Sequence, residues 1–196
     1  ITTGEKNIGV GYNAGVAITD AEDNVAVGQQ ALEANVNGDR NIAIGTRALD
    51  VNTASDNTAI GYEALRNNIG GADNVALGGY SLDANTSGTD NTAVGKSALG
   101  ANTSGSYNTG IGREALLLQN TTSANGATAV GYQAMRANNG TKNTAVGYQS
   151  IKNNTTGQSN TAVGYGTLSS ITSDGHHNTA IGGQSMASGT SARSNT

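Results

Sequence analysis

The stretch Asn143-Thr-Ala-Val-Gly-Tyr-Gln-Ser-Ile-Lys-Asn-Asn-Thr-Thr-Gly157 holds the pattern that decides the fold. Its first five residues are an asparagine, a β-branched residue, an alanine, an aliphatic residue and a glycine. The clearest copies begin at Asn24, Asn41, Asn57, Asn91, Asn143, Asn160 and Asn178. With weaker copies starting at residues 7, 74, 108 and 127, eleven copies follow one another at steps of 16 to 19 residues. This spacing predicts a solenoid, in which each coil packs on its neighbours.

Each coil is numbered here from its asparagine, which is position 0. Position 1 is Ile, Val or Thr, position 3 is Val, Ile or Leu, position 2 is Ala or Gly, and position 4 is Gly. Alternation with a period of two predicts a strand with one bulky and one bare face. Position 8 is Leu, Met or Ile from Leu32 onward, and a second short strand is expected over positions 6–9. A turn rich in Asn, Thr, Ser and Gly closes each coil.

The alternation also predicts which side chains are buried. We expect the bulky residues at positions 1, 3 and 8 to face a core. The small residues at positions 2, 4 and 7 should then leave a bare strip where another backbone approaches closely. Because identical strips repeat along a rod, they suit cyclic assembly of identical chains. The expected fold is an all-β parallel β-solenoid (a β-roll) of about eleven coils of ~17 residues. It forms a single repeat domain over residues 1–196, and we expect a fragment of a longer fibre because the chain has no initiator Met.

The asparagine at position 0 recurs directly above itself once the coils stack. An amide side chain can donate and accept along such a column, which predicts an asparagine ladder. The expected members are Asn24, Asn41, Asn57, Asn74, Asn91, Asn108, Asn143, Asn160 and Asn178, and Ala127 interrupts them. The alternative is that asparagine only forms a turn. Position 11 predicts a second, less complete ladder through Asn35, Asn52, Asn68, Asn85, Asn102, Asn138 and Asn154.

The composition argues against several classes of protein. The net charge is −4 with acids and bases mixed, so nucleic acid is not an expected partner. Apolar runs are too short for membrane insertion. The chain has no Cys, which excludes disulfides and thiolate metal sites. No cofactor is expected.

The motif Asn-x-Ala-[Val/Ile]-Gly followed by a small residue resembles the head repeats of trimeric autotransporter adhesins, the YadA-like β-roll. Its longer form, as in Asn143–Gly157, is closer to the repeats of bacteriophage tail fibres. The resemblance covers residues 5–186, although the adhesin heads repeat about every 14 residues. It implies a left-handed roll, a homotrimer, and a place outside the cell on a virion tail fibre or a bacterial surface. The implied function is the structural and receptor-facing shaft of a fibre that attaches to a cell surface.

Position 5 follows the glycine and should lie at an exposed corner. It is tyrosine at Tyr12, Tyr62, Tyr132, Tyr148 and Tyr165, and the last three lie in consecutive coils. Exposed aromatic rings with nearby amides suit sugar rings and their hydroxyls. The predicted glycan-binding residues are Tyr132, Gln133, Tyr148, Gln149 and Tyr165. The alternative is that tyrosine only covers a corner or a groove between chains.

Two further clusters were weighed as metal sites, and neither is predicted to be one. Asp56, Asp73 and Asp90 stack at position −1, where like charges ~5 Å apart repel and a cation could relieve them. The alternative is a solvated corner, and Arg40 indicates alternating charge. His176 and His177 have no carboxylate or Cys neighbours in the sequence, so a loop is the better interpretation.

The sequence shows no catalytic constellation, so we do not expect an enzyme. A polysaccharide depolymerase stays as an alternative, although paired carboxylates in a groove usually need long insertions. A second alternative is an ice- or surface-binding solenoid that uses Thr58, Thr92, Thr109, Thr128, Thr144, Thr161 and Thr179. An ice-binding face needs a flat, exposed, paired threonine array. If position 1 is exposed and planar, the fibre interpretation is weakened.

Overall fold

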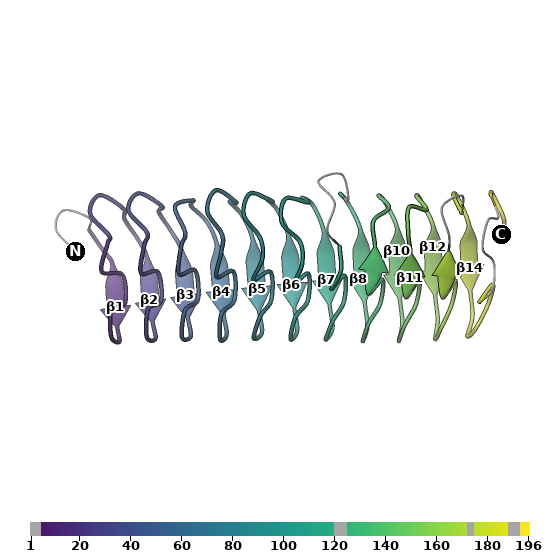
Figure 1. Cartoon of the computed structure of the whole chain (residues 1–196), viewed down its shortest axis with the longest axis horizontal. Helices are drawn as coiled ribbons and strands as arrows, with labels where there is room; N and C mark the ends of the chain where they lie inside the picture. The colour runs from purple at the N-terminus through teal and green to yellow at the C-terminus, as the bar shows by residue number, and fades with distance from the viewer. Residues whose placement is uncertain (1–4, 120–124, 172–174, 188–192) are drawn as a thin grey trace.

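The protein is a parallel β-solenoid whose coils stack along one long axis, with the two termini at opposite ends (Figure 1). The computed structural model describes residues 5–119, 125–171, 175–187 and 193–196. Eleven strands form one sheet, in the order β1-β2-β3-β4-β5-β6-β7-β8-β10-β12-β14. The chain makes about ten turns of ~17 residues between the first and the last of them. The predicted fold class is confirmed.

The strands of the large sheet are three residues each. They are β1 (Ile8–Val10), β2 (Val25–Val27), β3 (Ile42–Ile44), β4 (Thr58–Ile60), β5 (Val75–Leu77), β6 (Thr92–Val94), β7 (Thr109–Ile111), β8 (Thr128–Val130), β10 (Thr144–Val146), β12 (Thr161–Val163) and β14 (Thr179–Ile181). A second sheet of three short strands joins β9 (Ala137–Asn138), β11 (Asn153–Asn154) and β13 (Ser170–Ile171).

All neighbouring strands of the large sheet pair in parallel and in the same register. Position 2 of one coil lies beside position 2 of the next, as in the pair of Ala43 and Ala59. The pairing of Gly110 with Ala129 keeps this register across the longest step of the repeat. Extra residues are therefore absorbed in the corners. Each column of the repeat becomes a straight row of equivalent side chains along the rod.

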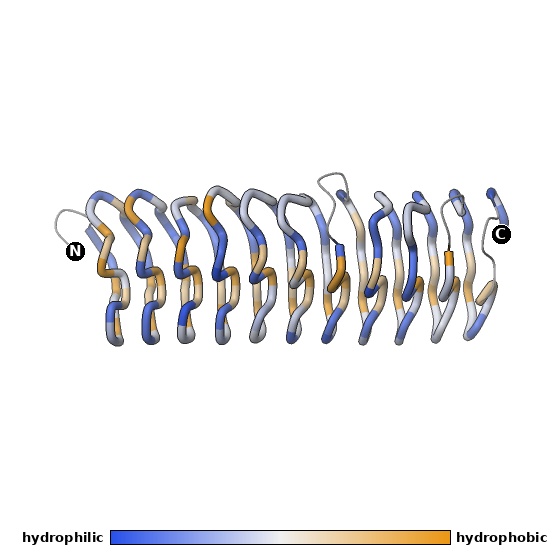
Figure 2. Tube along the Cα trace, in the orientation of Figure 1, coloured by the Kyte–Doolittle hydropathy of each residue, from blue (hydrophilic) through white to orange (hydrophobic). Residues whose placement is uncertain are grey.

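The strand faces are the reverse of our expectation. Position 2 points inward, and its alanines, such as Ala26 and Ala43, are fully buried. Positions 1 and 3 point outward, where Ile42, Val75 and Leu77 are 37, 40 and 45% exposed. In Figure 2 apolar residues recur at the same heights of successive coils, on the strands as well as inside. The predicted core at positions 1 and 3 is wrong, and so is the predicted bare strip at positions 2 and 7.

The thinness of the coil explains this reversal. Behind each strand runs the turn at positions 6–8 of the same coil. A Cβ added to Gly9, at position 2 of the first coil, would lie 3.1 Å from the carbonyl oxygen of Ala14. At Gly110 the corresponding distance to the carbonyl oxygen of Ala115 is 3.3 Å. The interior therefore has room for nothing larger than alanine at position 2, and the bulky residues must face outward.

The expected burial of position 8 is confirmed, but the expected strand around it is wrong. The residue is at most 1% exposed from Leu32 to Leu168. Positions 6 and 8 both have positive φ, as at Gln30 (57°) and Leu32 (52°), which bends the chain into a tight turn. A left-handed non-glycine residue costs about 1–2 kcal/mol. Full burial of a leucine side chain contributes ~1.5–3 kcal/mol, which offsets much of the cost of the two left-handed residues in each turn.

Glycine at position 4 is required for two independent reasons. Gly95 has a φ of 126°, which residues that carry a side chain rarely adopt. A Cβ there would also lie 2.7 Å from the carbonyl carbon of Gly112 in the next coil. The same contact repeats between successive position-4 glycines along the rod. This glycine column sets how closely the coils stack.

Candidate functional site

The asparagine column at position 0 joins neighbouring coils by side-chain hydrogen bonds. The backbone N–H of Asn91 donates to Oδ1 of Asn74 at 3.0 Å, and Nδ2 of Asn91 donates to the same atom at 3.0 Å. Nδ2 also donates to the carbonyl oxygen of Gly105, in the corner that begins the following coil, at 2.8 Å. Asn91 is fully buried, and its side chain thus links the preceding coil to the corner at Gly105. Equivalent backbone-to-Oδ1 bonds join Asn24, Asn41, Asn57, Asn74, Asn108, Asn160 and Asn178 to the coil before each of them.

The ladder extends past the eleven copies and is weakened once within them. Asn195 donates its N–H to Oδ1 of Asn178, so it occupies position 0 of a further coil. Ala127 donates its N–H to Oδ1 of Asn108 at 3.0 Å. Its methyl side chain has no oxygen to offer to Asn143 in the next coil. Instead, Nδ2 of Asn143 donates to Oδ1 of Asn138 at 3.1 Å.

Position 11 forms the second amide column, in two segments. Nδ2 of Asn85 donates to Oδ1 of Asn68 at 2.7 Å, and Nδ2 of Asn154 donates to Oδ1 of Asn138 at 2.6 Å. Asn52 accepts from Asn68 in the same way. These asparagines are also buried, so both amide columns are part of the scaffold and are not accessible to a ligand. Gln119, at the same position, is buried as well.

The tyrosines at position 5 lie at exposed corners, and three of them form a stack. The ring centroids of Tyr132 and Tyr148 are 5.2 Å apart, and those of Tyr148 and Tyr165 are 5.5 Å apart. Both ring pairs are stacked with an interplanar angle of 26°. Each face of Tyr148 is therefore covered by a neighbouring tyrosine. A sugar ring cannot stack on all three rings, and the only ring faces left lie at the two ends of the stack.

The glutamines beside the stack bond mainly within the chain. Gln133 Nε2 donates to Glu114 at 2.8 Å, and Gln133 Oε1 accepts from Gln149 Nε2 at 2.8 Å. Arg136 Nε also donates to Glu114, at 3.1 Å. The bonds from Gln133 and Arg136 lower the pKa of the Glu114 carboxyl. The structure brings all five predicted glycan residues together, but Gln133 acts chiefly as a link between coils.

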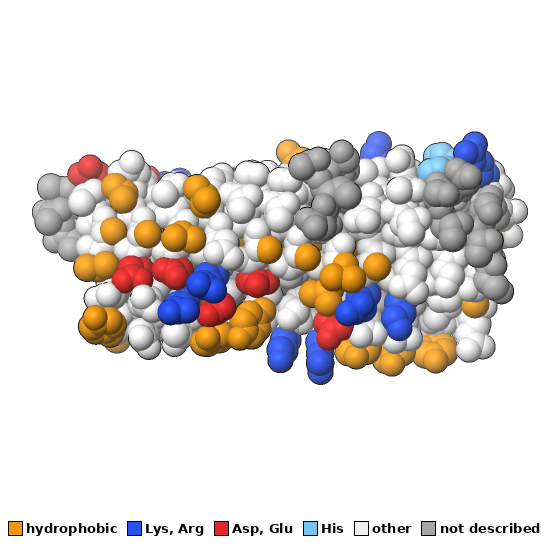
Figure 3. All heavy atoms as spheres, in the orientation of Figure 1, with side chains coloured by type: hydrophobic (Ala, Val, Ile, Leu, Met, Phe, Trp, Pro, Cys, Tyr) orange, Lys and Arg blue, Asp and Glu red, His pale blue; other side chains and the backbone are white. Residues whose placement is uncertain are grey.

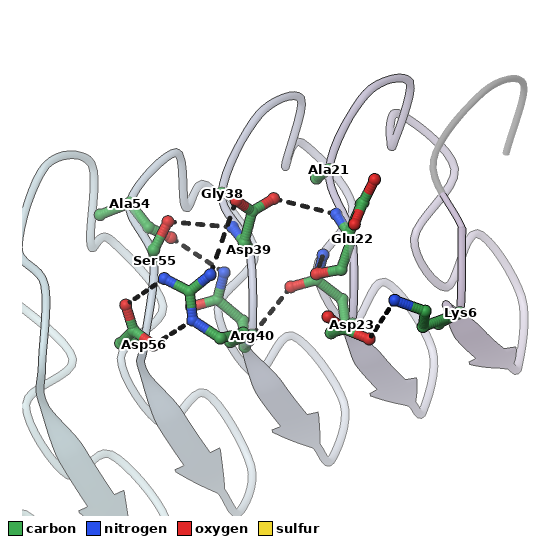
Figure 4. A network of polar contacts seen from close by, with 12 residues as sticks. Lys6, Ala21, Glu22, Asp23, Gly38, Asp39, Arg40, Ala54, Ser55 and Asp56 are labelled. Carbon is green, nitrogen blue, oxygen red and sulfur yellow. Dashed lines mark hydrogen bonds and ion pairs between the residues drawn. The ribbon is translucent and has the colours of Figure 1, made fainter.

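Position −1 carries alternating charges over the first four coils (Figure 4). Lys6 Nζ lies 3.9 Å from Asp23, and Arg40 donates to both carboxylate oxygens of Asp56 at 2.7 and 2.8 Å. The bond to Arg40 lowers the pKa of Asp56, and the bond to Asp56 raises the pKa of Arg40. Exposed pairs of this kind contribute little to stability. The sign of the charge thus alternates from Lys6 to Asp56. The next two residues of this column, Asp73 and Asp90, are both acidic.

Position −2 forms a hydrogen-bonding column that the sequence analysis missed. Its side chains accept a backbone N–H from the preceding coil: Asp39 from Glu22, Ser106 from Thr89, and His176 Nδ1 from Gln158 at 3.1 Å. His176 therefore has a structural role in its corner. The residue types at this position differ, which hid the column. The shared feature was a polar side chain two residues before position 0 in every coil except the one with Ala72.

The outward face of the large sheet carries exposed aliphatic side chains, among them Ile42, Val75 and Leu77. We call it the outer sheet face, and it consists of positions 1 and 3 of β1 to β14. Its position-3 column is aliphatic throughout: Val10, Val27, Ile44, Ile60, Leu77, Val94, Ile111, Val130, Val146, Val163 and Ile181. Its position-1 column mixes Ile, Val and Thr up to β5 and is threonine from β6 onward. Large exposed apolar patches on soluble proteins mark sites of contact with a partner.

On the view in Figure 3, charged side chains gather on the N-terminal and central coils. Hydrophobic side chains recur along one long edge, and Lys and Arg side chains interrupt them near the middle of the rod. No helix in the described residues is long and apolar enough to cross a membrane. Nor do these residues include a group of three or more His, Cys, Asp or Glu placed to hold a metal ion. No protein-family model matches this chain, and no curated protein or solved structure does so either.

Proposed function

We propose that this chain is the structural and receptor-facing shaft of a homotrimeric fibre, located outside the cell on a phage tail or a bacterial surface. The observation that carries the proposal is the outer sheet face, which presents aliphatic side chains along eleven strands in register. A flat apolar surface that repeats along a rod can be covered by the same surface of identical chains. The number of three chains, and the kinship with YadA-like adhesins or tail fibres, come from the sequence resemblance.

Several features support a shaft rather than a globular enzyme or a solute-binding domain. The coils are nearly identical, the interior is filled by alanine and leucine, and the polar interior groups bond from coil to coil. Recognition in a trimeric shaft would come from repeated exposed corners on three chains. Multivalent contact then raises the apparent affinity of individually weak sites.

Two valine substitutions test whether the outer sheet face is covered. Val75 on β5 and Val51 at a corner are both 40% exposed in the single chain. Val75→Lys places a charge on the outer sheet face, and Val51→Lys places the same charge elsewhere. Because burial of an unpaired ammonium is costly, we expect Val75→Lys to dissociate the assembly and Val51→Lys to leave it intact. Sedimentation equilibrium measures the mass, and circular dichroism checks that both variants fold. Equal masses for the two variants would refute the proposed interface.

An ice- or surface-binding solenoid is a second candidate, favoured by one observation. Position 1 points outward in the single chain, and it is threonine in six successive strands from β6 to β14. The threonines form a straight column with a spacing of about 4.8 Å. The neighbouring position-3 column is aliphatic, so the array is not the paired threonine array of the expectation.

Inhibition of ice growth distinguishes this candidate from the fibre shaft. Thermal hysteresis that is abolished by Thr128→Lys and kept by the corner variant Thr86→Lys would favour ice binding. Absence of thermal hysteresis in a protein that proves to be a single chain would reject both functions. Absence of it in a trimer would leave the shaft as the better account.

A further inference from the structure

Corner tyrosines form two clusters, one of Tyr62 with Tyr80 and one of Tyr132, Tyr148 and Tyr165. In each cluster the last tyrosine at position 5 is followed by a glycine at the same position of the next coil. In the first cluster Tyr62 is followed one coil later by Gly79 at the same position. In the second cluster Tyr165 is followed one coil later by Gly183. A glycine at position 5 has no side chain to cover the ring before it. Each cluster therefore creates a gap beside the face of its last position-5 tyrosine.

The chain fills the first gap itself. Tyr80, the residue after Gly79, turns its ring onto Tyr62, with centroids 5.3 Å apart and an interplanar angle of 67°. This edge-to-face contact is one of the favourable arrangements of aromatic rings. The first cluster thus shows that a flat six-membered ring fits the space beside a position-5 tyrosine.

The second gap has no such ring among the described residues. The residue after Gly183 is Gln184, which is exposed and has no aromatic ring. A Cβ built on Gly183 would meet nothing within 4 Å. Tyr165 is 55% exposed, and Tyr148 covers only one face of its ring. The C-terminal face of Tyr165 is therefore an open aromatic surface with a ring-sized space beside it.

We infer that the open face of Tyr165 binds one pyranose ring of a neutral glycan. The apolar C–H face of a sugar lies well on an aromatic ring, and the exposed amide of Gln184 can bond to its hydroxyl groups. Positions 5 and 6 of the surrounding coils, Tyr148, Gln149, Gly166 and Gly183 among them, carry no charge, which favours a neutral sugar over an acidic one. This inference rests on the proposed receptor-facing role and narrows it from a stripe of five residues to one ring face.

The test uses the whole chain and defined sugars. Cellohexaose and maltohexaose serve as neutral probes, a sialylated lactose as the acidic probe, and an aromatic pentapeptide as the competing class of ligand. Binding is followed by NMR of protein labelled at tyrosine. Because Tyr165→Ala removes the aromatic surface on which the sugar stacks, it should weaken the binding of a neutral probe by about two- to tenfold.

Three further variants make the result specific. Gly183→Tyr should extend the stack over the open face and abolish binding without disturbing the fold, since position 5 accepts tyrosine in other coils. Tyr165→Phe should keep binding, and Tyr12→Ala, at a distant position-5 corner, should leave it unchanged. The inference is overturned if Gly183→Tyr binds like wild type, if no neutral probe binds, or if only the peptide binds. A trimer that fails to bind sugar refutes this site alone, whereas a monomer refutes the proposed shaft.

Discussion

The two halves of the rod share one scaffold but present different surfaces. In residues 5–106 the outer sheet face carries Ile8, Val25, Ile42 and Val75 at position 1, and ion pairs cross between the coils. In residues 107–196 the same column is threonine, the small sheet β9-β11-β13 is added, and three tyrosines stack at the corner. Positions 0, 2, 4 and 8 hardly change. The repeat thus separates residues that build the coil from residues that are free to meet a partner.

The largest expected effect tests whether the glycine column serves both halves equally. Gly61→Ala and Gly147→Ala each place a Cβ 2.6–2.7 Å from a carbonyl carbon of the next coil, at a φ of 139° and 130°. We expect a loss of about 3–5 kcal/mol for either variant, measured by urea unfolding.

Gly182→Ala is the matched control for these two variants. Its φ is 108°, but nothing lies within 4 Å of the added Cβ. We therefore expect only the conformational cost of about 1–3 kcal/mol. The losses of stability in Gly61→Ala and Gly147→Ala should be similar. If they differ from each other by more than either differs from the loss in Gly182→Ala, the glycine column does not stabilise the two halves in the same way.

The asparagine column should come next in size. Asn91→Ala keeps the backbone bond to Asn74, but it removes the two hydrogen bonds that Nδ2 donates and leaves the buried N–H of Asn108 without its acceptor. The expected loss is about 2–3 kcal/mol in the N-terminal half and the same for Asn160→Ala in the C-terminal half.

The reverse substitution, Ala127→Asn, should stabilise the junction between the halves. It restores an acceptor for the N–H of Asn143, which we expect to add about 1 kcal/mol. If Ala127→Asn lowers the melting temperature, this coil cannot accommodate the asparagine of the column.

A large part of this architecture followed from the sequence. The period of the repeat indicated the parallel register, because equivalent residues must stack, and the large aliphatic residue at position 8 marked the true interior. The strand faces could not be assigned, since alternation shows that two faces differ but not which one lies inside. That choice depends on the turn behind the strand, where Gln30 and Leu32 adopt left-handed conformations that their residue types do not predict.

The corner site was foreseen in position but not in geometry. The spacing placed Tyr132, Tyr148 and Tyr165 in adjacent coils, whereas the orientation of their rings depends on side-chain torsions. One sequence feature did indicate the thin interior. Position 2 never exceeds alanine in any copy, and such an upper limit on size is typical of a tightly enclosed space.

Two substitutions at position 1 of the outer sheet face test whether its N-terminal and C-terminal halves contribute differently to assembly. Ile42→Thr should weaken assembly and Thr144→Ile should strengthen it, each by about 1 kcal/mol per chain, because an aliphatic side chain gains more from burial than threonine. The midpoint of dissociation in a dilution series measures both. If Thr144→Ile precipitates the protein or leaves assembly unchanged, the threonine column lies outside the interface.

Among the residues that the structure describes, Ile151 is the only β-branched residue with a positive φ, and it lies in the C-terminal interior. Ile151 has a φ of 45°, which is least favourable for a residue branched at Cβ, and most equivalent positions carry leucine. Ile151→Leu should raise stability by up to ~1 kcal/mol, read from the melting temperature. A decrease of more than ~1 kcal/mol would indicate that the shape of isoleucine is needed there.

The smallest effect concerns the charged corner of the N-terminal half. Arg40 holds the pKa of Asp56 below its ordinary value, so the pair stabilises the fold above the unfolded-state pKa near ~4 and is lost as the pH falls through the lower folded-state value. Asp56→Asn should be slightly less stable than wild type at pH 7, and the two should be equally stable once the pH lies below the folded-state pKa of Asp56. Added salt should also reduce the difference at pH 7. A difference that is independent of pH would assign the effect to packing.

The mass of the wild-type protein in solution tests the central claim most directly. The position-3 column of the outer sheet face is aliphatic on all eleven strands, and the account requires this face to be covered by copies of the same chain. Sedimentation equilibrium at micromolar concentration should give a single species of three times 19.5 kDa. A stable species of 19.5 kDa would contradict the account.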